Sequence, residues 1–553
     1  MTKYIHPFEN PLTDKINQSL IGNKGYNLCV MYGMGLPIPE GFIINSIASK
    51  DYINNSDFNK NFENELKENI NRIEKKTNLE IGNKDKPLIL SVRSGSKISM
   101  PGMLDTILNV GLNKEIVTSL SKDGNSFFAF DTWRRFIQMF SHVVYKVDNF
   151  DFDEILENYL LGANLSAISQ LDPEDLEEIS DMYLNLFKER IGKDFPQDPW
   201  QQINESIRSV IKSWENERAI SYRSINDIPE DYGLAVTVQR MVFGNLNDRS
   251  ASGVVFTRNP HTGENKIKGE YLMKSQGEDV VSGFITPKNI SESETDDSFA
   301  DIFEDIYLQI HQISKDLEKH FGFVQDIEFT IESGVLWILQ SRNAEVNPLA
   351  SFKISTDMVN EGIIDKPAAI KLIKEEHIEK SLVPILDDSQ ELIILTKGLP
   401  ASPGVTSGQA AFNIDAIKSI RDKGQKAILV LVETNTNDIK AMHASDAILT
   451  SRGGLTSHAA VIARGLGKPC ITGAREVEIN PENKTISIGN KKISEFDTIT
   501  LNGHSGEVIE GMAKTKPQEP SPELKEILDW CKNIAGSDIN DPVACLKKAR
   551  EKI

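Results

Sequence analysis

One stretch decides the fold of the second half of this chain: Leu449-Thr-Ser-Arg-Gly-Gly-Leu-Thr-Ser-His-Ala-Ala-Val-Ile-Ala-Arg-Gly-Leu-Gly-Lys-Pro-Cys-Ile471. An apolar strand runs into the turn Gly453-Gly454, and Thr456 or Ser457 then caps a short helix. His458 therefore lies in the first helical turn, where unpaired backbone N–H groups and the helix dipole favour anions such as phosphate. Histidine can form a covalent intermediate, so one interpretation of His458 is a nucleophile, although the local pattern by itself favours its alternative. The alternative is a histidine that only packs at the helix start.

The composition is that of an ordinary soluble protein, with 39% hydrophobic and 26% charged residues. A length of 553 residues is enough for roughly two to four domains. The formal net charge of −20 argues against a general binder of nucleic acid or of an anionic membrane. Any phosphate site must therefore be built locally from a few arginine and lysine side chains.

The cysteines and the N-terminus indicate the compartment. Cys29, Cys470, Cys531 and Cys545 lack the spacing of metal ligands, so we expect free thiols in a reducing environment. The N-terminus is polar, with no signal peptide, and no apolar run approaches the length of about 18 residues that a membrane helix needs. The sequence predicts a cytoplasmic protein.

Lys24 is the first candidate for a phosphate contact. The segment Leu20–Leu28 joins a polar lead to an apolar, helix-like stretch, and it lacks the spacing of a Walker A loop. In the functional interpretation, Lys24 meets nucleotide phosphates from a flexible loop bounded by glycines. The alternative is a surface turn without chemistry.

Arg93 is the second candidate. A buried strand, Leu88–Val92, is expected to deliver Arg93 at its end, where α/β folds commonly bind ligands. The loop that follows is rich in Ser, Gly and Pro, and so offers many backbone donors. A phosphate contact is favoured over the alternative, which is a structural ion pair.

A predicted hairpin supplies the remaining candidates. Val324–Glu332 and Val335–Arg342 alternate like half-buried strands on either side of the turn Ser333-Gly334. Alternation places two pairs of polar side chains on shared faces: Asp326 with Glu328, and Gln340 with Arg342. Paired carboxylates can hold Mg²⁺ while an arginine offsets phosphate charge, as phosphoryl transfer requires. The alternative is a sheet with one polar face toward water.

Composition shifts divide the chain into four expected parts. Apolar strands such as Ala427–Val432, turns and glycine-rich loops indicate a compact β/β/α domain around His458. The Pro-rich and charged run Ala513–Pro522 is predicted to be an exposed linker, and Asp541-Pro542 to start the last helix. The expected parts are a nucleotide-binding module (1–345), a helical linker (346–395), the histidine domain (396–512), and a linker with a final segment (513–553).

The run Arg452–Arg464 closely resembles the phosphohistidine segment of the PEP-utilising enzymes, the family of pyruvate phosphate dikinase and PEP synthase. The runs Ser91–Leu112, Phe130–Phe140 and Ser252–Glu264 resemble the nucleotide-binding half of pyruvate phosphate dikinase. The resemblance implies an α/β multidomain protein with an ATP-grasp module followed by a swivelling β/β/α phosphohistidine domain.

The resemblance also implies a reaction and its residues. His458 would be phosphorylated by ATP, with AMP and pyrophosphate released when inorganic phosphate accepts, and the phosphoryl group would go to pyruvate to give PEP. Thr456 occupies the family's regulatory phosphorylation position. Asp326 and Glu328 also fall on metal positions, for Mg²⁺. The ATP-binding positions of the family fall on Lys24, Arg93, Asp326, Glu328, Gln340 and Arg342.

The PEP/pyruvate-binding barrel of the family needs about 250 residues, so we expect it to be missing here, with 513–553 covering a remnant of its start. A separate barrel chain is then an expected partner, and a homodimer is compatible with the resemblance. Two alternatives stay open: a PEP synthase-like enzyme, and a truncated, non-catalytic ATP-binding regulatory fragment. A drug phosphotransferase of similar plan would need a large substrate domain between the modules, and the stretch 346–390 is too short for one.

Overall fold

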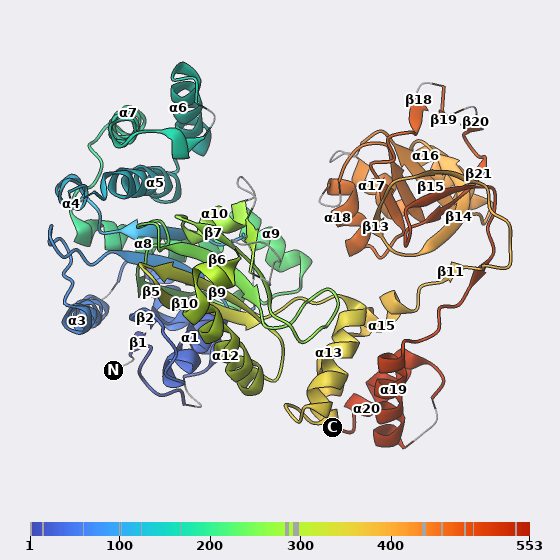
Figure 1. The fold of residues 1–553 in the computed structure, drawn as a ribbon, viewed down its shortest axis with the longest axis horizontal. Helices are drawn as coiled ribbons and strands as arrows, with labels where there is room; N and C mark the ends of the chain where they lie inside the picture. Colours follow the sequence, from blue (N-terminus) through green and yellow to red (C-terminus); the bar gives the residue numbers. More distant parts are fainter. Residues whose placement is uncertain are drawn as a thin grey trace. The chain divides into compact units, whose positions relative to one another are not determined.

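The computed structural model describes residues 3–13, 16–58, 60–98, 100, 102–122, 124–165, 167–282, 287–290, 298–433, 438–454, 457–480, 483–489, 491–536 and 539–553. At positions 225, 231, 281, 282, 458, 461 and 465 the description is limited to the backbone. The contacts divide the chain into two units (Figure 1). The N-terminal unit is Met1–Asn259 with Asn265–Glu345, and the C-terminal unit is Pro260–Glu264 with Val346–Ile553.

The first sheet of the N-terminal unit is antiparallel throughout. Its strands lie in the order β1 (Ile5–Pro7), β2 (Gly41–Ile44), β5 (Ala235–Arg240), β3 (Leu90–Gly95) and β4 (Thr106–Val110). The expectation that a strand ends before Arg93 is wrong: β3 continues to Gly95, and Arg93 pairs with Thr106 and Thr237 inside it. An arginine is tolerated within the strand because its guanidinium reaches groups of the second sheet.

Helices accompany this sheet in the N-terminal unit. An apolar stripe on α5, which includes Trp133, Phe136 and Phe140, is buried in the larger core of the unit. In this core, α5 packs against β4 and α7. The helices are α1 (Gln18–Gly33), α2 (Ser46–Asn55), α3 (Lys60–Thr77), α4 (Lys114–Leu120), α5 (Ser126–Tyr145), α6 (Asn149–Gly162), α7 (Pro173–Ile191), α8 (Pro199–Lys212) and α9 (Glu217–Ile225).

The second sheet contains the predicted hairpin. Its antiparallel strands lie in the order β10 (Val335–Asn343), β9 (Gln325–Glu332), β6 (Ala251–Phe256), β7 (Lys268–Met273) and β8 (Lys288–Asn289), with helices α10 (Gly277–Ser282), α11 (Phe299–Ile302) and α12 (Glu304–Phe321). Ser333 and Gly334 both have positive φ, at 50° and 83°, which suits a tight two-residue hairpin turn. The hairpin read from the alternation is confirmed.

Five helices of the C-terminal unit share one core. They are α13 (Pro348–Asn360), α14 (Lys366–Leu372), α15 (Glu375–Ser381), α19 (Pro522–Ala535) and α20 (Pro542–Arg550). Asp541 caps α20 as expected, accepting from the backbone N–H of Ala544. Most of Ala513–Pro522 is exposed or half-exposed, as predicted, and the structure adds a short strand within it. This strand, β23 (Thr515–Lys516), pairs with β11 (Ile385–Leu386), because both connections run side by side and satisfy each other's backbone groups.

The rest of the C-terminal unit is a mixed sheet in which four neighbouring strands, β14 to β17, run parallel. Helices cover one face, and a small sheet of β18 (Glu478–Asn480), β19 (Thr485–Ile488) and β20 (Lys491–Ser494) contributes to the core on the other. The helices are α16 (Ile414–Asp422), α17 (Ile439–Ala444) and α18 (His458–Gly465). The strand order is β12 (Ile394–Lys397), β22 (Glu507–Glu510), β21 (Thr498–Asn502), β14 (Val405–Ala411), β15 (Ala427–Leu431), β16 (Ala447–Thr450), β17 (Cys470–Thr472) and β13 (Leu399–Ser402).

The structure therefore has the mixed α/β, multidomain organisation that the sequence predicts. All four cysteines are buried thiols. In the part of the chain that the structure describes, none of the helices combines the length and the apolar character needed to cross a membrane.

Candidate functional site

Lys24 lies on a helix rather than in a flexible loop, so that expectation is wrong. The helix α1 is kinked at Gly22, whose φ of 70° is positive. A Cβ at Gly22 would come within 2.6 Å of the carbonyl oxygen of Gly95, so only glycine permits this approach. The backbone N–H of Asn23 donates to the carbonyl of Ser96 at 2.9 Å. These contacts hold the start of α1, and with it Lys24, against the end of β3.

Arg93 joins the two sheets of the N-terminal unit. Its Nη2 donates to Oε2 of Glu328 at 2.8 Å and to Oε1 of Gln340 at 3.4 Å. Its Nη1 donates to the carbonyl oxygen of Leu339 at 3.4 Å. The guanidinium of β3 is thus fixed by groups of β9 and β10, and it still has N–H donors that these contacts do not use.

The hairpin side chains pair across the two strands. Arg342 lies opposite Asp326, and Gln340 opposite Glu328, in the register of β9 with β10. Arg342 donates from Nε to Oδ2 of Asp326 at 2.8 Å, and Gln340 donates from Nε2 to Oε1 of Glu328 at 3.1 Å. A bulge between Ile338 and Gln340 adjusts the strand at this point. The four side chains and Arg93 therefore form one polar cluster.

Lys24 belongs to the same cluster by its electrostatics. Burial lowers the pKa of Lys24 to about 7, with the charges of Arg93 and Arg342 adding to the effect and that of Glu328 opposing it. Burial also acts to raise the pKa of Glu328, but Arg93 and Lys24 outweigh it and hold that pKa below its ordinary value. Three cationic groups thus surround two carboxylates, an arrangement that favours a polyanionic ligand.

The two carboxylates fit a magnesium ion that a nucleotide would bring. Burial raises the pKa of Asp326, against the charge of Arg342, and Oδ1 of Asp326 is buried without a hydrogen-bond partner among the described atoms. Mg²⁺ usually takes one or two protein carboxylates and fills its other positions with water and phosphate oxygens. Within the described residues, no group of three or more His, Cys, Asp and Glu side chains could hold a metal without such help.

The His458 segment has the predicted strand–turn–helix form. β16 ends at Thr450, and Ser457 caps α18, accepting from the backbone N–H of Ala460 at 3.4 Å. His458 is the first residue of α18; its side chain, and the whole of Thr456, lie outside the described residues. The backbone N-terminus of α18 therefore stands where the sequence places it.

Two buried threonines brace the turn before α18. Thr450 donates from Oγ1 to the carbonyl of Arg452 at 2.8 Å, and Thr472 donates to the carbonyl of Gly454 at 3.4 Å. At Gly473, where φ is 62°, a Cβ would come within 2.6 Å of the carbonyl oxygen of Gly453. The backbone directly after β17 consequently packs tightly against this turn.

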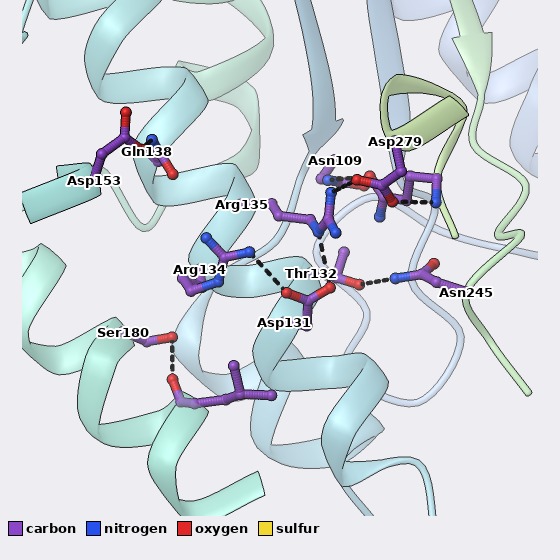
Figure 2. Close-up of polar contacts among 12 residues, drawn as sticks. Asn109, Asp131, Thr132, Arg134, Arg135, Gln138, Asp153, Ser180, Asn245 and Asp279 are labelled. Carbon is purple, nitrogen blue, oxygen red and sulfur yellow. Dashed lines mark hydrogen bonds and ion pairs between the residues drawn. The ribbon is translucent and has the colours of Figure 1, made fainter. Parts of the chain in front are cut away.

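The structure also contains a series of linked ion pairs that the sequence interpretation did not single out. Asp131 contacts both Arg134 and Arg135, and Arg135 reaches Asp279 at the start of α10 (Figure 2). The spacing of Asp131 from two arginines by three and four residues, on a helix rich in apolar residues, is the sequence signal for it. The long-range contact with Asp279 has no such local signal.

Comparison with known proteins assigns families to both halves. Residues 58–305 and 290–362 match the model described as "Pyruvate phosphate dikinase, AMP/ATP-binding domain". Residues 424–506 match the model described as "PEP-utilising enzyme, mobile domain". The first match contains Arg93 and the β9–β10 hairpin, and the second contains His458.

Relatives named pyruvate, phosphate dikinase cover nearly the whole chain. The identity is 41% over 535 residues with the protein of Clostridium symbiosum, covering 96% of this chain and 60% of the relative. It is 41% over 519 residues with that of Rhizobium meliloti (92% and 58%), and 40% over 560 residues with that of Rickettsia prowazekii (99% and 63%).

The chain spans less than two thirds of the length of these curated relatives. The AMP/ATP-binding domain model, however, matches more than half of this chain and contains most of the polar cluster described above. The chain therefore belongs to the pyruvate phosphate dikinase family.

Proposed function

We propose that this chain is the ATP-using part of a pyruvate phosphate dikinase, an ATP-grasp module followed by a swivelling phosphohistidine domain, and that it phosphorylates His458. In the reaction, AMP keeps the α-phosphate and the β-phosphoryl group stays on His458. The γ-phosphoryl group joins inorganic phosphate as pyrophosphate. The observation that supports this best is the convergence of Lys24, Arg93 and Arg342 around Asp326 and Glu328.

Different residues of the cluster would bind the phosphates and the magnesium ion. Arg93 and Arg342 have guanidinium N–H groups beyond those bound to the carboxylates, and these can donate to phosphate oxygens in a fixed fork. Lys24 adds a point charge, and Gln340 orients Glu328. Asp326 and Glu328 would hold Mg²⁺, which neutralises phosphate charge when bound. Catalysis would then rest on positioning and on electrostatic stabilisation of the transferring group.

The N-terminus of α18 suits the accepting histidine. Unpaired backbone N–H groups in the first helical turn favour a phosphoryl group next to His458. Thr456, two residues earlier, is proposed as a regulatory phosphorylation position on the family resemblance. A phosphate placed there would introduce a second negative group beside the acceptor.

The test of the proposal is covalent labelling. With ATP labelled at the β-phosphate, Mg²⁺ and inorganic phosphate, the protein should acquire acid-labile, base-stable label and release AMP and pyrophosphate. His458→Asn should abolish the label. The matched control is His443→Asn, because His443 is an exposed histidine of α17 in the same unit, and this variant should label normally.

Three other results would each replace the proposal. Label that persists in His458→Asn would place the carrier elsewhere. Label without a requirement for phosphate, with inorganic phosphate in place of pyrophosphate as product, would indicate PEP synthase chemistry. Binding of ATP with no label in the wild-type chain would indicate a non-catalytic regulatory fragment.

The proposed destination of the phosphoryl group is pyruvate, on a barrel that a separate chain supplies. The purified chain should then form phosphohistidine but no PEP from pyruvate, and adding a separate PEP/pyruvate-binding barrel domain should restore PEP formation, measured by coupled assay. His458→Asn mixed with the same barrel is the control. PEP made by the chain alone, or label that no barrel ever accepts, would refute this destination.

A further inference from the structure

The helix α5 carries a buried carboxylate that binds two arginines. Asp131 is 4% exposed. Its Oδ1 accepts from Nη2 of Arg134 at 2.8 Å, and its Oδ2 accepts from Nε of Arg135 at 2.8 Å. The two arginines point in different directions from this carboxylate, and only Arg135 points toward α10 (Figure 2). Asp131 therefore fixes the direction of Arg135 from within the same helix.

The chain of contacts continues into the backbone before α10. Nη1 of Arg135 donates to Oδ1 of Asp279 at 2.8 Å. The second oxygen of Asp279, Oδ2, accepts a hydrogen bond from the backbone N–H of Gln276 at 2.9 Å. Because Gln276 directly precedes α10, this bond satisfies a backbone donor at the start of the helix. The side chain of Gln276 in turn accepts from Nδ2 of Asn109 on β4 at 3.4 Å. The contact between Arg135 and Asp279 thus connects α10 to α5, and the hydrogen bond of Asn109 connects the residue before α10 to β4.

α10 lies on the other sheet, next to the candidate ATP site. It packs against β6, β7 and β9, and β9 carries Asp326 and Glu328. Its residue Glu278 is half-buried, and burial raises the pKa of this carboxyl to about 7, with Arg135 and Arg93 opposing the effect and Asp279 adding to it. The packing of α10 on β9 therefore couples the position of this helix to the strand that carries two carboxylates of the polar cluster.

The ion pairs are poorly explained as a device for stability alone. Burial acts to raise the pKa of Asp131, but Arg135 and Arg134 outweigh it, so this carboxylate stays ionised at neutral pH. Removing two charges from water costs about as much as their attraction returns, and buried pairs are often replaceable by apolar residues without loss of stability. What the pairs do provide is a fixed geometry between α5 and α10.

We propose that Asp131 is a positioning residue for phosphoryl transfer, which holds Arg135 so that α10 stays fixed against α5 and against β9, the strand that carries Asp326 and Glu328. The inference rests on the proposed function, since the step that α10 would serve is the phosphorylation of His458. Arg135 and Asp279 transmit the effect, and Asp131 acts only through them.

The test is Asp131→Asn, which keeps the shape of the side chain and removes its charge. The rate of β-phosphoryl labelling should fall by about 10- to 100-fold, by analogy with the loss of a hydrogen-bonding partner that orients a metal ligand. Hydrogen exchange should accelerate in the amides of α10 and not in those of α12. In an Arg135→Gln background, Asp131→Asn should cause no further loss of rate.

Asp153→Asn is the matched control. Asp153 lies on α6 and accepts a hydrogen bond from Gln138 of α5 at 2.8 Å, so it is outside the series of contacts from Asp131 to Asp279 (Figure 2). This variant should label and exchange like the wild type.

Three results would overturn the inference: an unchanged labelling rate in Asp131→Asn, exchange that rises equally in α10 and α12, or a full further loss of rate in the Arg135→Gln background. If the wild-type protein never acquires the β-phosphoryl label, that result contradicts the proposed function instead. The exchange of α10 in Asp131→Asn then decides by itself whether Asp131 positions this helix.

Discussion

The two candidate sites of this protein are built in opposite ways. The His458 site is one continuous segment, from β16 through a turn into α18, and its cap, Ser457, is the neighbour of the histidine. The candidate ATP site collects Lys24 from α1, Arg93 from β3 and the pairs of the β9–β10 hairpin. The first site therefore depends on local backbone geometry, whereas the second depends on how two sheets meet.

The difference predicts where substitutions act. A change in the ATP site should disturb partners that are distant in sequence, since Arg93 contacts both Glu328 and Gln340. A change in the turn before α18 should disturb only the placement of His458. Nucleotide binding and phosphoryl acceptance should then respond to different substitutions.

The largest expected effect is that of Arg93→Lys. A lysine keeps the charge but cannot reproduce a fork that spans a carboxylate, an amide and a phosphate. Loss of a transition-state contact of several kcal/mol implies a fall of about 100-fold or more in the single-turnover labelling rate. The melting temperature serves as the control for folding. A labelling rate equal to that of the wild type would reduce Arg93 to a structural ion-pair residue.

Gly473→Ala should have a smaller effect, confined to the histidine site. Its Cβ would meet the carbonyl of Gly453 at 2.6 Å, and the positive φ of 62° adds strain. The turn must shift, and because misplacement by about 1 Å can cost about 100-fold, a smaller shift should lower labelling roughly 10-fold. Equilibrium binding of ATP should stay unchanged. A parallel loss of ATP binding would break the proposed separation of the two sites.

The smallest expected effect concerns pH, through Lys24. In the free protein burial lowers its pKa to about 7, while a bound polyphosphate favours the charged form. Binding above pH 7 therefore takes up a proton, and ATP affinity should fall as pH rises, by at most about tenfold per unit. Calorimetry at pH 8 in two buffers of different ionisation enthalpy measures the uptake. Lys24→Arg, which stays charged, should remove it; the same uptake in that variant would assign the proton to another group.

The sequence correctly predicted the elements whose signals are local. Alternation was sufficient for the β9–β10 hairpin because strand side chains have a period of two, and the turn residues Ser333 and Gly334 fitted it. The cap at Ser457 and the pair Asp541-Pro542 were read in the same way. Each of these depends on hydrogen bonds or sterics within a few residues.

The wrong predictions all concern partners that are distant in sequence. Lys24 lies on a helix because Gly22 lets α1 pack against Gly95. Arg93 lies inside β3 because the second sheet supplies its partners. The short strand Thr515–Lys516, within a linker that is mostly exposed as predicted, likewise depends on Ile385–Leu386 beside it. None of these contacts has a periodicity or a cap that a linear pattern could reveal.

By itself, the sequence determined the family, the strand–turn–helix around His458 and the polar faces of one hairpin, because each is encoded in neighbouring residues. Only the tertiary structure decided that Arg93 bridges two sheets and that Asp131 reaches α10 through Arg135 and Asp279. The physical reason is that a buried charge requires a partner, and the chain supplies that partner from wherever folding brings a complementary group.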